Sequence, residues 1–284
     1  MIIVRIHGGL GNQLFQYCLG RNLALRNRTK LKFDTSFFDK SVDRRFLLDK
    51  FNTSGEVASV NEINKIKPDD IFHKVFNKII PNKNIVNEKS YDFDKKILEL
   101  KDNIYLSGVW PSEKYFDGIE DVLRREITLK KTLGKEASVV AEKIKLLYNP
   151  ISIHIRRGDY VTNEKFSKVH GTCDPEYYEK AIKFFQEKIG PSSFFVFSDD
   201  IPWVKVNISL PQNSILVSKK EIFDYEELIL MSMCKNHIIA NSTFSWWGAW
   251  LNNNPEKIVI APKDWFADSV RNSKDLIPES WITI

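Results

Sequence analysis

The sequence predicts an α/β protein of two domains, each built around a parallel sheet. Residues 2–6 are an apolar run typical of a buried strand, and residues 8–11 are a glycine-rich turn. Residues 14–25 have apolar side chains at three- and four-residue spacings, which predicts a helix, and a second strand pattern follows at 31–34. A strand, turn, helix and strand in this order begin a parallel sheet with right-handed crossovers.

The second half of the chain repeats this alternation after Pro150. Three apolar segments predict strands, and two helical segments separate them: strands at 151–155, 193–200 and 236–241, and helices at 174–189 and 224–235. Residues 40–145 are less patterned and suggest lysine-rich helices with one strand at 103–110. We therefore expect domains at 1–148 and 149–284, with a last helix whose packing against either domain stays open.

Composition excludes several classes of protein. The chain has 284 residues, 43% of them hydrophobic, which is ample for a packed core. The net charge of +5 is mild and acids lie between the lysines, so nucleic acid is not an expected partner. Three widely spaced cysteines, Cys18, Cys173 and Cys234, indicate reduced thiols. The N-terminal apolar run is too short for a secretory signal, and no segment approaches the ~18 apolar residues of a membrane span. These features predict a cytoplasmic protein.

In open α/β sheets ligands bind beyond the carboxyl ends of strands, so the residues that follow each strand are the candidate site. The first such segment is HGGLGNQLFQY, in which Gly9 and Gly11 allow close approach to the backbone at a helix start. Compared with the dinucleotide fingerprint GxGxxG, its third position is Leu14, although Asp34 lies where a ribose-binding acid is expected. The alternative is a plain turn with Asn12 as the helix cap.

The second segment is HIRRGDY, residues 154–160. Strand alternation puts three isoleucines on one face and His154 and Arg156 on the other. An arginine fork suits the oxygens of a phosphate, and Arg157 adds charge beside it. The alternative is a structural ion pair with Asp159.

The third and fourth segments follow the next two predicted strands. Ser198, Asp199 and Asp200 end the third, where a carboxylate can accept hydrogen bonds from a base or ribose, or can cap a helix. In the fourth, NSTFSWWGAWL, hydroxyl groups and free amides converge at a helix start: Asn241, Ser242, Thr243, Phe244 and Ser245. The tryptophans that follow are expected to pack in the core.

Metal and nucleophile chemistry have weaker signals. Asp92-Phe93-Asp94 matches the DxD pattern of metal-dependent sugar transferases, but lysines follow it and we interpret it as a solvated charge cluster. The sequence contains no HExxH or GxSxG motif. The whole set is explained by two facing α/β domains, of which the second holds a nucleoside diphosphate and the first supplies its glycine turn across the cleft. That is the geometry of a sugar-nucleotide transferase.

HIRRGDY, NSTFSWWGAWL and GGLGNQLFQY together resemble the α-1,2-fucosyltransferases of glycosyltransferase family 11, and they span residues 8–251. The resemblance implies a GT-B fold of two Rossmann-like domains, the N-terminal one on the acceptor side. It also implies GDP-β-L-fucose as donor, a terminal β-galactoside of an oligosaccharide or glycolipid as acceptor, and inversion. No metal or other cofactor is expected. A role in bacterial surface glycan (O-antigen) synthesis follows, with contact at the inner face of the membrane left open.

The resemblance also implies roles for individual residues. Arg156 would contact the diphosphate and His154 would lie beside the nucleotide. The loop Ser242 to Ser245 would cradle the phosphate, while Asp199 or Asp200 would meet guanine or ribose. From the first domain, the pair Asn12 and Gln13 would reach the donor.

The base that accepts the acceptor proton is open at this point. Asp159 is the first candidate and Glu164 the second, and Asp159 could instead orient Arg156. Three other functions also remain: a dinucleotide-dependent oxidoreductase that uses Gly9, Gly11 and Asp34, a carbohydrate-binding module, and a transferase of another GDP-sugar.

Overall fold

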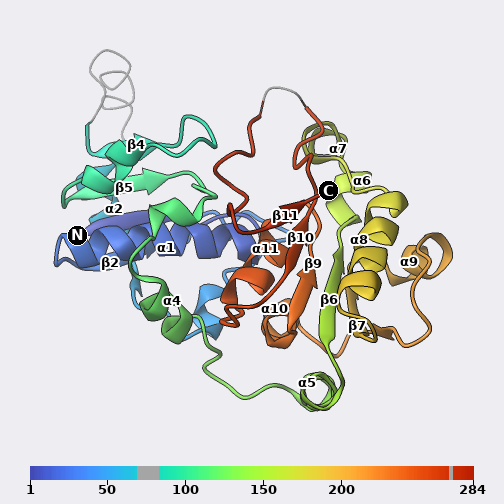
Figure 1. Ribbon diagram of the computed structural model, residues 1–284. Coiled ribbons are helices and arrows are strands. Elements are labelled where there is room, and N and C mark those ends of the chain that lie inside the picture. Colours follow the sequence, from blue (N-terminus) through green and yellow to red (C-terminus); the bar gives the residue numbers. More distant parts are fainter. Residues whose placement is uncertain (69–82, 269–270) are drawn as a thin grey trace. The chain divides into compact units, whose positions relative to one another are not determined.

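The computed structural model describes residues 1–68, 83–268 and 271–284. It divides the chain into two compact units, Met1–Lys130 and Lys131–Ile284 (Figure 1). None of the helices in these residues is long and apolar enough to cross a membrane.

The division comes earlier in the chain than the predicted boundary at 148/149. Helix α5 (Lys135–Leu146) is the reason, because its apolar face packs in the core of the second unit. Val140 and Ile144 of α5 belong to the same cluster as Phe195 and Leu230. The helix therefore begins the second unit and does not end the first.

A five-stranded parallel sheet forms the centre of the first unit, in the order β3-β2-β1-β5-β4. Its strands are β1 (Ile2–Arg5), β2 (Leu31–Asp34), β3 (Glu56–Val57), β4 (Ile85–Asn87) and β5 (Ile104–Ser107). The apolar β1 is central and buried on both faces, as parallel strands covered by helices are. The strand order reverses between β1 and β5.

Helices cover both faces of this first sheet. They are α1 (Leu10–Arg26) on one face and α2 (Val60–Ile66) on the other. The unit also contains α4 (Glu120–Glu126) and the 3₁₀ turns η1 (Leu48–Lys50), η2 (Lys95–Glu99) and η3 (Glu113–Tyr115). α1 can approach β1 closely because Gly20 has no side chain. A Cβ at this position would lie 2.4 Å from Val4 Cγ2. Ile3 points to the other face, where it packs with Ile66 of α2.

The second unit is built on a six-stranded parallel sheet in the order β11-β10-β9-β6-β7-β8. Its strands are β6 (Pro150–Ile155), β7 (Ser193–Ser198), β8 (Ile215–Leu216), β9 (Asn236–Ile238), β10 (Val259–Ala261) and β11 (Ile282–Thr283). The order runs outward from β6 to β8 and then starts again on the other side of β6 with β9.

Helices lie on both faces of the second sheet (Figure 1). Besides α5 they are α8 (Pro175–Lys188), α9 (Ile201–Asn207), α10 (Asp224–Met233) and α11 (Thr243–Leu251). The short helices α6 (Gly158–Thr162) and α7 (Glu164–His170) lie beyond the carboxyl end of β6 (Figure 1). α8 and α9 pack on the isoleucines of β6, and α5 and α10 pack on Phe195 and Phe197 of β7. The alternation that the sequence predicted for β6 is confirmed.

Several short elements were not predicted. Strands β3, β4, β8, β10 and β11 have only two or three residues each, too few to give a periodic pattern. The last helix in the described residues is α11, and β10, β11 and turns follow it. The three cysteines are free thiols, as expected.

A buried polar cluster crosses the core of the second unit at His237 of β9. Nδ1 of the His237 ring lies 2.8 Å from Ser152 Oγ, and Nε2 lies 2.8 Å from Asn252 Nδ2. Asn252 Nδ2 also donates to the carbonyl of Cys234, so it is a donor and Nε2 must accept. Burial and the charge of Lys257 lower the pKa of His237 to about 3. The neutral ring is therefore the folded form.

This cluster predicts loss of stability in acid. The pKa of His237 is about 3 in the fold and 6.5 for an unperturbed imidazole, so its contribution is complete above pH 6.5 and is lost as the pH falls toward 3. The free energy of unfolding should fall by up to about 1.4 kcal/mol per pH unit in this window because of His237 alone. Urea unfolding from pH 7.5 to 4 measures it. His237→Asn should be less stable at neutral pH but less sensitive to acid, and equal slopes would contradict the assignment.

Candidate functional site

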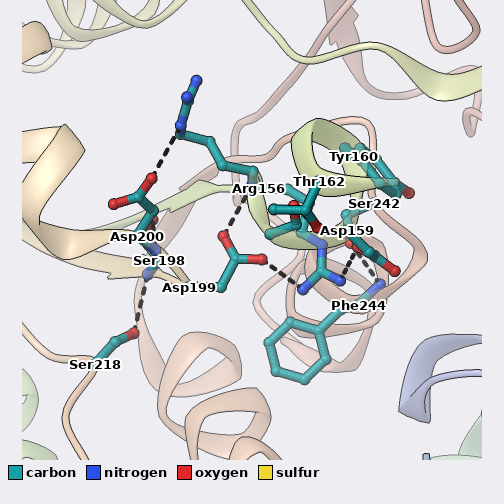
Figure 2. A network of polar contacts seen from close by, with 12 residues as sticks. Arg156, Asp159, Tyr160, Thr162, Ser198, Asp199, Asp200, Ser218, Ser242 and Phe244 are labelled. Carbon is teal, nitrogen blue, oxygen red and sulfur yellow. Dashed lines mark hydrogen bonds and ion pairs between the residues drawn. The ribbon is translucent and has the colours of Figure 1, made fainter. Parts of the chain in front are cut away.

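The strands β6, β7 and β9 bring three of the four predicted segments together. β6 lies between the other two, and the register pairs Ile155 with Ser198 and Ile153 with Ile238. Because all three strands are parallel, their carboxyl ends meet at one edge. The strand order reverses between β6 and β9, and α/β proteins bind ligands beyond such a reversal. Figure 2 shows the polar residues at this edge.

Arg156 is held between two carboxylates (Figure 2). Its Nη2 lies 2.5 Å from Asp159 Oδ1 and its Nη1 lies 2.8 Å from Asp199 Oδ2. Burial alone would lower the pKa of Arg156, but the charges of Asp199 and Asp159 outweigh it and raise the pKa. The ion pair with Asp159 that the sequence left open is therefore present, and Asp199 adds a second one. The guanidinium is fixed in place with its charge retained.

Asp199 also fixes the backbone of the segment that follows β6. Its Oδ1 accepts a hydrogen bond from the Arg157 amide at 2.9 Å. Gly158 makes this approach possible, because a Cβ at that position would lie 2.4 Å from Asp199 Oδ2. Glycine at position 158 of HIRRGDY is thus required by close packing against Asp199, which follows β7.

Arg157 pairs with Asp200 at the start of α9. Arg157 Nε lies 3.2 Å from Asp200 Oδ2, and its guanidinium lies 3.8 Å from the centre of the Trp203 ring. Asp200 Oδ1 accepts the Trp203 amide and caps the helix. The helix-cap alternative for this segment is thus observed at Asp200. Ser198 supports it, since its hydroxyl accepts the Asp200 amide at 3.0 Å.

His154 lies inside the protein beneath this edge. It is 4% exposed, and its Nδ1 has no hydrogen-bond partner within the described residues. Burial and then the charge of Arg156 lower its pKa to about 3, so the ring is neutral. The ring lies 5.5 Å from that of Phe244, between the centroids. His154 therefore joins β6 to the loop that follows β9.

The segment after β9 leads into α11, which begins at Thr243. Ser242 is the N-cap, and its hydroxyl accepts the Phe244 amide at 3.3 Å. Thr243 is the first residue of the helix, and both it and Phe244 are half-buried. A nine-residue helix therefore begins beside Arg156, Asp159 and Asp199, which we call the arginine cluster. Its first turn faces the carboxyl edge of the sheet. This orientation favours an anion.

Two residues of the same loop are scaffold. Asn241 is 2% exposed, and its Nδ2 donates to the carbonyls of His170 and Trp265 at 2.8 and 3.2 Å. Ser245 is 1% exposed and donates to the Ser242 carbonyl. Their side chains hold the loop. Ser242 is also buried and its hydroxyl caps the helix, so Thr243 and Phe244 are the half-buried residues at this helix start. The tryptophans after them pack in the core, as expected.

Glu227 is a residue that the sequence reasoning missed. It lies on α10, half-buried, and accepts a hydrogen bond from Ser218, whose hydroxyl in turn accepts the Ser198 amide at 2.9 Å. Burial, with smaller effects from the charges of Asp224 and Asp199, raises the pKa of Glu227 to about 7. A carboxyl group with such a pKa, linked to the carboxyl end of β7, is a candidate for function. Its position in a helical run, far from the motifs, hid it.

The glycine turn of the first unit differs in detail from the prediction. Gly8 has a φ of 77° and Gly9 is the N-cap of α1, so the helix begins at Leu10. Gly11 is inside the helix and buried, and Asn12 is not the cap that the alternative required. The helix starts earlier because both glycines before it supply the turn.

Gln13 is a buried bridge within the first unit. Its Nε2 donates to the carbonyls of Gly8 and Arg45 at 3.0 and 2.8 Å, and its Oε1 accepts the Leu47 amide at 2.9 Å. The side chain is fully buried. Gln13 therefore fixes the segment after β2 beside the glycine turn, and its own polar atoms are engaged.

Asp34 is also engaged in the core. It is 3% exposed and accepts hydrogen bonds from the Tyr105 hydroxyl at 2.5 Å and from the Ser36 amide at 3.0 Å. Burial would raise its pKa, but these hydrogen bonds outweigh it and lower the pKa. The ribose-binding role that the oxidoreductase alternative gave Asp34 is thus wrong, because the carboxylate faces the protein interior.

The DxD sequence is part of local turns. Asp94 caps η2 by accepting the Lys96 amide at 3.0 Å, and Phe93 packs on Tyr115 with ring centres 4.9 Å apart. Across the described ranges, no group of three or more His, Cys, Asp or Glu residues could hold a metal ion.

Comparison with known proteins decides the family. The sequence matches the profile of Glycosyl transferase family 11 over residues 1–284. The chain belongs to glycosyltransferase family 11. The family resemblance drawn from the three motifs is thereby confirmed, and the protein is an enzyme of glycosyl transfer.

Two Escherichia coli relatives cover the family-11 chain along nearly all of its length. An alpha-1,2-colitosyltransferase is 36% identical, and the alignment covers 100% of this chain and 99% of that protein. The O-antigen biosynthesis glycosyltransferase WbnK is 33% identical, with 98% and 99% covered. The human galactoside alpha-(1,2)-fucosyltransferase 1 is 29% identical over 51% of this chain and 42% of its own.

Solved structures support the fold of this family-11 member. The NodZ alpha-1,6-fucosyltransferase soaked with GDP-fucose superposes with a TM-score of 0.52 at 12% identity, covering 88% of this chain and 92% of that one. POFUT1 in complex with GDP-fucose gives 0.50 at 14% identity, covering 92% and 97%. The expected GT-B class, α/β with two parallel sheets, is confirmed.

Proposed function

We propose that this family-11 enzyme transfers L-fucose from GDP-β-L-fucose to the 2-hydroxyl of a terminal β-galactoside, with inversion at the fucose anomeric carbon. The observation that carries the proposal is Arg156, fixed by two carboxylates beside the start of α11 at the carboxyl ends of β6, β7 and β9. The names of the E. coli relatives support an α-1,2 linkage and a place in O-antigen synthesis.

The chemistry needs stabilisation of the departing nucleotide. As the bond from fucose C1 to the phosphate oxygen breaks, that oxygen gains negative charge and GDP leaves. In this proposal Arg156 meets the charge as a fixed donor, and the positive end of the α11 dipole adds to the stabilisation. They are already oriented by neighbours, so little reorganisation is needed during the reaction. We propose on this ground that turnover needs no divalent metal.

Galactose O2 attacks C1 from the opposite side and loses its proton. Asp159 Oδ1 is already engaged by Arg156, which fits an orienting role for this carboxylate. The Glu164 side chain is 82% exposed and paired with Lys168 at 2.6 Å. We therefore propose that Asp159 is a positioning residue for Arg156, with Glu164 as the remaining candidate base.

The variant Asp159→Asn separates these two roles. If Asp159 orients Arg156, the variant should weaken GDP binding and lower kcat by roughly tenfold each, the usual effect of losing a hydrogen bond to a charged group. Titration calorimetry with GDP and steady-state kinetics measure the two quantities. An unchanged Kd with kcat lowered by about 10²-fold or more would instead make Asp159 the general base.

Glu227 gives the donor site a means of selecting the nucleobase of the sugar nucleotide. Guanine presents two neighbouring N–H donors, N1–H and the 2-amino group, and an ionised carboxylate accepts both. Uracil and adenine lack this pair. We propose that Glu227, linked to the end of β7 through Ser218, selects guanine.

The test of the function is product analysis. The purified protein is incubated with GDP-fucose and lactose in EDTA, and the product is examined by NMR. An α-1,2-fucosylated lactose is expected. GDP-colitose is the matched alternative donor, because colitose lacks only the 3-hydroxyl of fucose and a relative is named for it. Turnover of GDP-colitose alone would correct the sugar, and no transfer from either donor would contradict the proposal.

A further inference from the structure

The end of α5 exposes an unusual concentration of apolar side chains. Four of the twelve large hydrophobic residues exposed in the described part of the chain fall within ten positions: Val139, Leu146, Leu147 and Tyr148. Leu146 is 82% and Tyr148 71% exposed. Single exposed apolar residues are ordinary, but a contiguous group marks a surface for contact.

The backbone beneath these side chains is fixed. The Leu147 amide closes the last turn of α5 on Lys143, and Ser193 of β7 donates to the Tyr148 carbonyl at 3.2 Å. Asn149, directly after, is 7% exposed. The exposure of Leu146 and Tyr148 is therefore imposed by the fold and does not arise from a loose end.

Basic residues surround this group. Lys143 and Lys145 lie on the last turns of α5, and Lys235, also exposed, has its Nζ 3.4 Å from Asn149 Oδ1. Glu142 is the acid among them, and it is paired with Lys145 at 2.8 Å. The local charge is positive. We define the α5 surface as Val139, Lys143, Lys145, Leu146, Leu147 and Tyr148.

We infer that the α5 surface docks on a bilayer that contains anionic lipids. Leucine and tyrosine with flanking lysines are the side chains that settle at a lipid–water interface, where apolar parts enter the acyl boundary and ammonium groups meet phosphates. The surface lies at the amino end of β6, whereas the arginine cluster lies at the carboxyl end (Figure 1). Docking there leaves the carboxyl edge of the sheet uncovered. The inference does not depend on the proposed donor or acceptor.

Vesicle flotation of the full chain tests the inference. Vesicles of phosphatidylcholine with one third phosphatidylglycerol should carry the protein, and vesicles of phosphatidylcholine alone should carry much less. The double variant Leu146→Asp with Tyr148→Asp should bind at least about tenfold more weakly. Lys143→Glu with Lys145→Glu should lose about fivefold or more per lysine. These positions are exposed, so the circular dichroism and melting temperature should stay those of the wild type.

Val206→Asp is the matched control. Val206 is 83% exposed on α9, which covers the opposite face of the same sheet. It should float like the wild type. The inference is overturned if the wild type does not bind anionic vesicles, if it binds neutral ones equally, or if the control loses as much binding as the Leu146 and Tyr148 pair.

Discussion

Replacement of Arg156 by alanine should leave the fold of the second unit intact and lower kcat by about 10²- to 10³-fold, the typical loss for one preorganised donor. The guanidinium is oriented by Asp159 and Asp199 and is placed to meet charge on the departing phosphate. Its removal also leaves two carboxylates near that phosphate, which adds repulsion. Steady-state kinetics with a saturating donor measure the effect, and thermal unfolding checks the fold.

Arg156→Lys and Arg157→Ala are the comparisons. Lysine keeps the charge but not the planar fork, so it should recover only part of kcat. Arg157 is committed to Asp200 and Trp203, and its loss should cost less than that of Arg156. A kcat near normal in Arg156→Ala would rule out the proposed stabilisation of the leaving group.

Replacement of Glu227 by glutamine should raise the Kd for GDP by about ten- to a hundredfold, because a charged acceptor of two hydrogen bonds is lost. The pKa of Glu227 is about 7 in the free protein, and guanine is expected to bind only the ionised form. GDP affinity should therefore fall as the pH drops below about 7, by up to roughly tenfold per pH unit, and the variant should lack this dependence.

Titration calorimetry with GDP and UDP at pH 8 and pH 6 measures this second effect. Glu221→Gln is the control, since Glu221 is exposed just before the same helix. Preference for GDP over UDP should disappear in Glu227→Gln and persist in the control. If the variant keeps both its selectivity and its pH dependence, Glu227 does not read the base.

The sequence predicted the sheets well where strands are long. β1, β6 and β7 are buried apolar runs, and the rule that ligands bind at carboxyl ends directed attention to the correct loops. It could not predict two- and three-residue strands such as β8 and β11, since pairing with a neighbour creates them. Nor could it place α5, because its apolar face fits either unit until the packing is known.

Side-chain direction was the harder part of the site. Gln13 and Asn241 stand in motifs whose polar residues suggest ligand contact, yet both point inward and hold backbone segments. Glu227 stands outside any motif, and only its burial beside Ser218 reveals it. A motif thus contains both residues placed to contact a ligand and residues that hold the backbone. Only the contacts that each side chain makes with distant parts of the chain show which of the two it is.

The location of bound GDP tests most directly whether Arg156 and the start of α11 form the donor site. We would determine a crystal structure of the protein with GDP or GDP-fucose. We predict the diphosphate within hydrogen-bonding distance of Arg156 and beside the start of α11, with the guanine edge against Glu227. A diphosphate bound elsewhere, with Arg156 still closed between Asp159 and Asp199 and away from it, would contradict the proposed donor site.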